Sequence, residues 1–485
     1  MSSVKQESIQ GVKWSVFEKF AVQGIQFVLG IILARLLDPS DYGVIGMHGI
    51  FIAISQTFID SGFSSALIRK IDRTEDDYCT AFYFNIVIAI VCYTILFIIA
   101  PWVGKFFHTP ILCPILRVQS ISLIINSLMA VQVTRLTIDI NFKALSNRSI
   151  LSTIVSGIVG IILAYLGWGV WALVVQSLMT SIVNMIFIWI YCKWYPTQPF
   201  SKESFRNLFS YGSKLLASGL INTIYSNLTT LVIGRQFSAT DLGVYNRGTS
   251  IPSLPVYNIN GALQRVLFPI LTRFQNDEKQ LIAYYRKYIG IVSMGLFFIC
   301  SLIAALGRPL VLFLLTDKWE SCIIYLQIFA FAIMFDHLSI INHSMLLAVG
   351  RSDLFLKLEF IKKPVYIAIL FAAIPFGVLG ICISKIVSNQ AAVIMNTYYT
   401  GKLFKFGYWA QLKDFSPYLL YSIIACLPAY FFTLLELPHI ISLIFGGITS
   451  PMLYWLLLRK NPYMVEIIGM AKIKMNSIRQ LKRFV

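Results

Sequence analysis

The sequence predicts an all-α polytopic membrane protein with about fourteen transmembrane helices, built as two six-helix lobes related by a parallel repeat plus two C-terminal helices. Its 485 residues are 57% hydrophobic and only 13% charged, whereas a soluble domain carries about 25% charged residues. Apolar stretches long enough to cross a hydrocarbon core of about 30 Å recur from end to end. A ten-residue motif also returns 200 residues later, which indicates an internal repeat.

Each apolar stretch is expected to form a membrane-spanning helix, and the short loops leave no room for a large soluble domain. The stretch at 241–271 is the least hydrophobic, and its neighbours require it to be a helix. The predicted spans are 12–37, 42–67, 79–103, 111–138, 147–167, 169–192, 208–234, 241–271, 284–306, 319–349, 354–375, 378–400, 415–434 and 438–458.

The repeated motif occupies residues 35–44 and again 235–244, and each copy joins the end of one span to the start of the next. A capping side chain with an aspartate three residues on resembles a capping box. The pairs are Asp38 with Asp41 and Ser238 with Asp241. An even number of spans separates the copies, so both halves run through the membrane in the same direction. Parallel repeats are typical of secondary transporters, with the substrate path between the halves.

The repeat and the loops divide the chain into five parts. These are an N-lobe at 1–192, a cytoplasmic linker at 193–207, a C-lobe at 208–400, two further spans within 401–459 and a tail at 460–485. The tail interleaves apolar and basic residues, a pattern typical of an amphipathic segment on an anionic inner leaflet.

Lys and Arg gather in the segments on one side of the predicted spans, whereas the other side holds few, such as Lys105 and Arg308. Cytoplasmic loops carry an excess of basic residues, so both termini are expected in the cytoplasm. The same placement accounts for the net charge of +18. No continuous basic face with interleaved aromatics suggests a nucleic-acid partner.

Several kinds of chemistry have no motif in this sequence. It contains no GxxxxGK[ST] element for nucleotide hydrolysis and no recognisable paired carboxylates or activated nucleophile. The eight cysteines are scattered without metal-ligand spacing and are expected to be small buried side chains. We therefore expect a protein that is not an enzyme and has no metal and no cofactor.

Charged side chains inside the spans are the strongest indication of function, because an isolated charge in hydrocarbon costs several kcal/mol. Such residues should face a partner or a watery cavity, and together they suggest a polar path whose basic members suit an anionic passenger. They are Glu18, Lys19, Asp60, Arg247, Arg265, Asp336, His337, His343 and Lys385.

Several stretches resemble polysaccharide flippases of the MOP exporter superfamily. Residues 31–44 (IILARLLDPSDYGV) and 60–69 (DSGFSSALIR) look like the opening of these proteins, and 167–176 (GWGVWALVVQ) matches a recurring stretch of their sixth helix. In the second lobe, 231–235 (LVIGR) and 267–277 (LFPILTRFQND) are similar to the Wzx-type, colanic-acid and teichuronic-acid exporter branch. The resemblance runs from about residue 8 to 460.

This resemblance implies a multi-pass exporter in the bacterial inner membrane, moving undecaprenyl-pyrophosphate-linked repeat units for O-antigen, capsule or exopolysaccharide by alternating access. It also implies two lobes around a cationic cavity. The implied partners are the lipid-linked oligosaccharide, membrane lipids, and the polymerase and glycosyltransferases of the pathway. Alternatives within the superfamily are a lipid II flippase and a multidrug or cation antiporter. A membrane glycosyltransferase or polymerase is the alternative from another class, and it would need larger loops.

Family patterns fix no catalytic residue, so the site residues follow from intramembrane charge. Arg247, Arg265 and Lys385 are predicted to neutralise the pyrophosphate. Tyr225 and Tyr257 are predicted to stack on sugars. An ion gradient would be coupled through acidic residues, with Glu18, Asp60 and Asp336 left as equal choices. The glycan and the coupling ion stay open.

Overall fold

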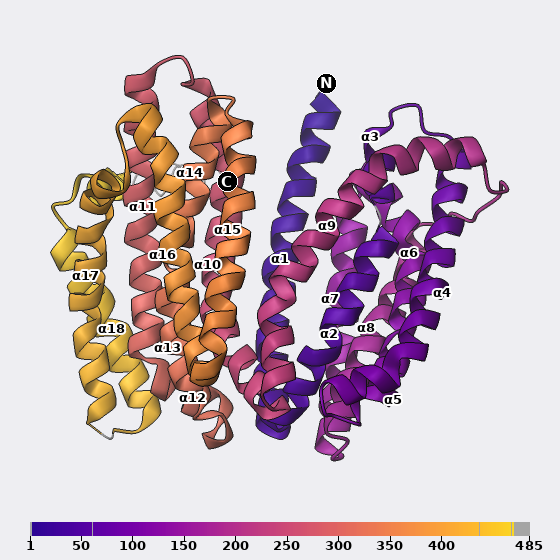
Figure 1. Ribbon diagram of the computed structural model, residues 1–485, viewed down its shortest axis with the longest axis horizontal. Helices are drawn as coiled ribbons and strands as arrows, with labels where there is room; N and C mark the ends of the chain where they lie inside the picture. The colour runs from indigo at the N-terminus through magenta and orange to yellow at the C-terminus, as the bar shows by residue number, and fades with distance from the viewer. Residues whose placement is uncertain (1, 61, 436, 467, 470–485) are drawn as a thin grey trace, which may run out of the picture. The chain divides into compact units, whose positions relative to one another are not determined.

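The computed structural model describes residues 2–60, 62–435, 437–466 and 468–469, which form α-helices, two short 3-10 helices and turns, with no strand among them (Figure 1). Twelve helical stretches in this part of the chain are long and apolar enough to cross a membrane. One of them, Ser352–Phe404, holds two successive helices, and the predicted span 241–271 lies in a further helix of 35 residues. The all-α membrane class is confirmed, and every predicted span has its helix or helices.

The chain packs as two compact units, 1–244 and 245–485. This boundary lies within α10 (Ala239–Arg273), whose first residues belong to unit 1. The division into lobes made from the sequence falls earlier, at the linker 193–207, because it follows the repeat rather than the packing. α9 (Lys202–Gln236) packs against α2, α3 and α4, which is why it belongs to unit 1. The division of the chain into five parts, which was based on the repeat and the loops, remains a prediction.

Unit 1 is a bundle in which α7 packs along α1 and α8, α4 packs along α6, and α2 lies against α9. Polar side chains begin several of its helices, as at Asn141, whose side chain accepts from the Ala144 N–H. The helices that lie wholly in unit 1 are α1 Ser2–Leu36, α2 Pro39–Asp60, α3 Phe63–Arg69, α4 Glu75–Phe106, α5 Leu112–Gln119, α6 Ile121–Ile138, α7 Phe142–Tyr165, α8 Val170–Tyr191 and α9.

Unit 2 contains the rest of α10 and a bundle in which α11 packs along α17, α13 and α14 pack against α16, and α15 packs along α16. The two C-terminal helices α17 and α18 lie side by side at one edge of this unit (Figure 1). The remaining helices are α11 Glu278–Ala305, α12 Gly307–Leu315, η1 Asp317–Trp319, α13 Cys322–Ile333, α14 Asp336–Ala348, α15 Ser352–Ala373, η2 Ile374–Phe376, α16 Gly377–Phe404, α17 Tyr408–Leu434 and α18 His439–Leu458.

Three predicted spans are broken where the sequence suggested continuous helices. The span 42–67 is interrupted before α3, where Gly62 adopts a left-handed conformation with φ of 73°. The span 111–138 is divided between α5 and α6, and 319–349 between α13 and α14. A glycine or a polar residue marks each break, such as Gly62, Ser120 and Asp336, but a single residue of this kind within an apolar stretch does not by itself end a helix.

Helix α9 begins at Lys202, inside the predicted linker 193–207, and the Ser201 side chain accepts a hydrogen bond from the Ser204 N–H at this start. The segment before this cap is hydrogen-bonded to α4. The Trp194 indole donates to Glu75 at 2.8 Å, and the Ser201 N–H donates to the Thr80 hydroxyl at 3.0 Å.

The internal repeat is visible in the helix boundaries. α1 and α9 each have 35 residues, at 2–36 and 202–236, and α2 and α10 begin 200 residues apart, at Pro39 and Ala239. The predicted capping pattern is confirmed in the second copy, where Ser238 and Asp241 exchange hydrogen bonds between side chains and backbone N–H groups. In the first copy, the Asp41 carboxylate accepts from the Asp38 N–H at 3.1 Å.

The two motif copies also meet through their glycines within unit 1. A Cβ on Gly43 would lie 1.7 Å from the Ala239 carbonyl oxygen, and a Cβ on Gly243 would lie 1.8 Å from the Pro39 carbonyl oxygen. Because Pro39 and Ala239 are equivalent in the repeat, each copy packs on the other in the same way. Only glycine permits this backbone contact at both positions.

Candidate functional site

The largest polar connection between predicted site residues lies in unit 2. The Asn389 side chain of α16 donates to the Asp336 carboxylate of α14 at 2.8 Å and to the Ala332 carbonyl at the same distance. Lys385 stands one turn before Asn389, acts electrostatically on Asp336, and lies over the Tyr366 ring of α15 at 5.5 Å. Asp336 and Lys385 therefore bring one acidic and one basic side chain to this place, and the two charges offset one another.

The helix α10 carries the other predicted cations and an aromatic residue. Arg247 is half-buried, and its guanidinium lies 5.8 Å from the centre of the buried Trp319 ring. Arg265 is exposed, and Tyr257 has 63% of its side chain exposed. On a helix that is predicted to span the membrane, an exposed guanidinium requires water or an anion nearby. Arg265 is consequently the predicted cation most accessible to a charged substrate.

In unit 1, Glu18 of α1 accepts a hydrogen bond from the Ser146 hydroxyl of α7 at 3.3 Å. It also acts electrostatically on Arg148, two residues further along α7. The Arg148 Nε and Nη1 atoms are buried and make no hydrogen bond to any described residue. Glu18 is thus part of a charged contact between α1 and α7, in which two Arg148 nitrogen atoms have no acceptor among the described residues.

Asp60 stands at the exposed end of α2 and accepts from the Gln56 amide at 3.0 Å. Gln56 in turn accepts from the Asn126 amide of α6 at 3.2 Å. This chain of hydrogen bonds connects α2 to α6. Tyr225 lies on α9 and is half-buried.

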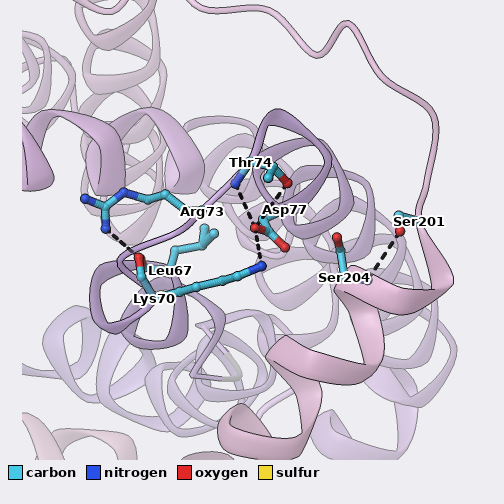
Figure 2. Close-up of polar contacts among 7 residues, drawn as sticks. All are labelled: Leu67, Lys70, Arg73, Thr74, Asp77, Ser201 and Ser204. Carbon is cyan, nitrogen blue, oxygen red and sulfur yellow. Dashed lines mark hydrogen bonds and ion pairs between the residues drawn. The ribbon is translucent and has the colours of Figure 1, made fainter.

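One end of unit 1 holds a group of basic residues around the turn after α3, shown in Figure 2. Lys70 forms an ion pair of 2.7 Å with the fully buried Asp77, which also accepts from the Thr74 N–H. Arg73 donates to the carbonyl oxygens that end α3, including that of Leu67. The topology predicted from Lys and Arg places this end in the cytoplasm.

A cavity of about 400 Å³ opens beside this group, between the turn and the start of α9. The Arg69 guanidinium at its edge lies 4.6 Å from the centre of the Tyr211 ring. The other lining residues include Lys70, Asp72 and Asn207. Its mixture of cationic and hydrogen-bonding side chains could receive an anionic group.

Among the predicted site residues, the structure brings together Lys385 and Asp336, for which different roles were predicted. Arg247, Arg265 and Tyr257 share α10 but have separate surroundings. Tyr225, Glu18 and Asp60 belong to unit 1 and lie on different helices.

Several charged residues inside helices were not among the predicted site residues. Arg148 is one of them and lies six residues after the start of α7 at Phe142. Glu359 and Lys362 in α15 are two others, and they form an ion pair of 2.5 Å with each other. The spacing of three residues between opposite charges is a signal that could have identified this pair.

His337 and His343 lie six residues apart on α14 and contact different helices. His337 pairs with Ser293 of α11 at 2.7 Å, whereas His343 contacts Asn396 of α16 at 3.1 Å. Within the described ranges, no three His, Cys, Asp or Glu side chains come together as metal ligands would. All eight cysteines, each a described residue, are free thiols, and every one except Cys113 is buried.

A family model described as polysaccharide biosynthesis protein matches residues 32–324, more than half of the chain. The teichuronic acid biosynthesis protein TuaB of Bacillus subtilis (strain 168) is 26% identical over 393 residues, which cover 78% of this chain and 79% of that protein. The succinoglycan biosynthesis transport protein ExoT of Rhizobium meliloti (strain 1021) is 24% identical over 310 residues, covering 64% and 63%.

Among solved structures, the lipid II flippase MurJ in an inward closed conformation superposes with a TM-score of 0.70. The match covers 92% of this chain and 99% of that chain, at 13% sequence identity. The likeness extends over nearly the whole of both chains and concerns the fold.

Proposed function

The chain belongs to the polysaccharide biosynthesis protein family, and from that premise we propose that it is a flippase for lipid-linked oligosaccharides. It would move undecaprenyl-pyrophosphate-linked repeat units from the inner to the outer leaflet of the bacterial inner membrane by alternating access. Both termini would lie in the cytoplasm, as the distribution of Lys and Arg predicts.

One observation carries this proposal: twelve described helical stretches are long and apolar enough to cross a membrane, and charged side chains such as Glu18, Asp336 and Lys385 lie inside them. Polysaccharide biosynthesis needs a step in which a charged, hydrated precursor crosses the bilayer. A protein made of such helices suits that step. The relative ExoT is named a transport protein, which supports the same choice.

The cations of α10 have the chemistry that a pyrophosphate requires. Arg265 is exposed and presents a guanidinium that can bind two phosphate oxygens at once. Arg247 is half-buried, with its guanidinium over the Trp319 ring, and would make the second contact with the pyrophosphate. Tyr257 offers an exposed ring on the same helix for a sugar face. Lys385 is the weaker choice, because the charge of Asp336 offsets its own.

Translocation changes no covalent bond, so the protein needs no nucleophile and no general acid. Deleting the gene is expected to leave complete repeat units attached to the lipid carrier. Mass spectrometry of the lipid-linked pool checks this, with the restored wild-type gene as control. A pool whose repeat unit lacks a sugar would instead assign the protein to glycosyl transfer.

A further inference from the structure

Four polar side chains meet inside unit 2 where α14, α15 and α16 pack together. The Nε2 atom of His343 on α14 lies 2.9 Å from the Lys362 Nζ atom and 3.1 Å from the Asn396 Oδ1 atom. Lys362 also donates to Glu359 at 2.5 Å, and the Glu359 carboxylate lies 3.9 Å from the same imidazole nitrogen. We call these four residues the histidine cluster.

The histidine cluster lies within the helices rather than in the loops that join them. Lys362 stands ten residues after the start of α15, a rise of about 15 Å. Asn396 is fully buried, while the Lys362, His343 and Glu359 side chains keep 13%, 19% and 31% of their surface exposed. The cluster is therefore partly open at the surface of unit 2 and otherwise enclosed by protein.

The Nε2 atom faces two neighbours with opposite requirements. The Lys362 ammonium can only donate, so it requires an imidazole nitrogen that accepts. The Asn396 Oδ1 atom can only accept, so it requires a nitrogen that carries a proton. A neutral ring with its proton on Nδ1 satisfies Lys362, and a doubly protonated ring satisfies Asn396. The His343 ring therefore has a hydrogen-bond partner in its neutral form and another in its protonated form.

We propose that His343 is the proton-binding site of this exporter, switching its partner from Lys362 to Asn396 when it takes up a proton. The inference rests on the proposed function, and it names the coupling ion and a residue that sequence analysis did not assign to coupling. In the step, a solvent proton bonds to the free electron pair of Nε2. The resulting N–H donates to Asn396, and Lys362 keeps Glu359 as its partner.

The charges around His343 explain why this proton would move a helix contact. Before uptake, Glu359 and Lys362 offset one another and the ring is neutral; afterwards the cluster carries one net positive charge. Lys363 on α15 adds a nearby cation, whereas Asp336 and Lys385 lie two turns or more away along α14 and α16. From α11, the Tyr285 hydroxyl is engaged with Asn342. Repulsion between imidazolium and ammonium would therefore release α15 from α14.

A proton suits this site better than a metal cation does. Hard cations such as Mg²⁺ and Ca²⁺ bind through several oxygen ligands. Here the Glu359 oxygen is already taken by an ammonium group, and that group would repel a second cation.

The test uses purified full-length protein in proteoliposomes that contain the undecaprenyl-pyrophosphate-linked repeat unit. Translocation is compared at equal pH and with an acidic exterior, for wild type, His343→Gln and the control His439→Gln, which changes an exposed histidine at the start of α18. We expect the gradient to accelerate translocation several-fold for wild type and the control. His343→Gln should translocate at one rate in both conditions.

The possible results separate the two hypotheses. Translocation by wild type with an undiminished gradient response in His343→Gln would refute the proton site and leave the flippase intact. No translocation by wild type would refute the proposed function instead. The site is then decided by NMR of isotope-labelled histidines, of which the chain has five. A titrating imidazole signal that vanishes in His343→Gln and changes its midpoint in Asn396→Leu supports the site, and its absence overturns it.

Discussion

Single residues decide which parts of the polar interior can contact a substrate. Several intramembrane charges could be identified from the sequence, because a charged residue within an apolar stretch is conspicuous. Sequence analysis could not tell that Asp336 and Lys385 offset one another, since that depends on which faces of α14 and α16 meet. It could not tell that Arg265 is exposed while Arg247 is held by Trp319. Burial and pairing arise from tertiary packing, which a single span does not encode.

Replacing Arg265 by alanine should abolish surface polysaccharide while leaving the amount of folded protein in the membrane nearly unchanged. The exposed guanidinium has no structural ion pair among the described residues, so its loss removes a ligand rather than a support. Arg265→Lys keeps the charge without the two-pronged geometry and should restore export only in part. Surface glycan and membrane protein level are measured together. Normal export by Arg265→Ala would remove this residue from the site.

At the scale of the helices, apolar stretches and capping residues predicted the approximate boundaries. The repeat predicted which positions in the two halves are equivalent. The exact offset of 200 residues between α1 and α9 could be expected from the repeated motif. The reciprocal packing of Gly43 and Gly243 could not, because the motif marks the glycines without showing what lies against them. The breaks after α2, α5 and α13 fall at glycine or polar residues that do not by themselves end a helix, so these breaks could not be expected.

Gly43→Ala and Gly243→Ala should each lower stability, because the new methyl group would collide with a backbone carbonyl rather than with a side chain that can move. Overpacking of this kind costs about 1–3 kcal/mol, or more where backbone must shift. Gly49→Ala in α2 and Gly261→Ala in α10 are matched controls, since nothing lies within 4 Å of a Cβ at either position. Thermal unfolding in detergent compares the four variants. Equal melting temperatures for variants and controls would contradict the close packing.

For the whole molecule, composition alone predicted the membrane class, and the placement of Lys and Arg predicted its orientation. The division into packed units was beyond the sequence, because the repeat places α9 in the second lobe whereas its contacts place it with the first unit. Function was accessible through family resemblance, and the choice of substrate-binding residues required the structure.

The predicted orientation places the segment between α8 and α9 in the cytoplasm. A reporter enzyme that is active only in the periplasm, fused after Thr197, should give no signal. The same reporter fused after Trp168, in the turn between α7 and α8, should be active, because one membrane crossing separates the two positions. A reversed pattern would overturn the orientation and the cytoplasmic assignment of both termini.

The central claim is that the protein alone carries a lipid-linked oligosaccharide across a bilayer. Purified protein is placed in liposomes with the repeat unit extracted from a deletion strain, and a membrane-impermeant oxidant of sugar diols reports which molecules face outward. We expect the oxidised share to rise from the outer-leaflet fraction to nearly the whole pool with wild-type protein, and to stay at that fraction with Arg265→Ala. If wild-type vesicles match protein-free vesicles, the protein is not a flippase.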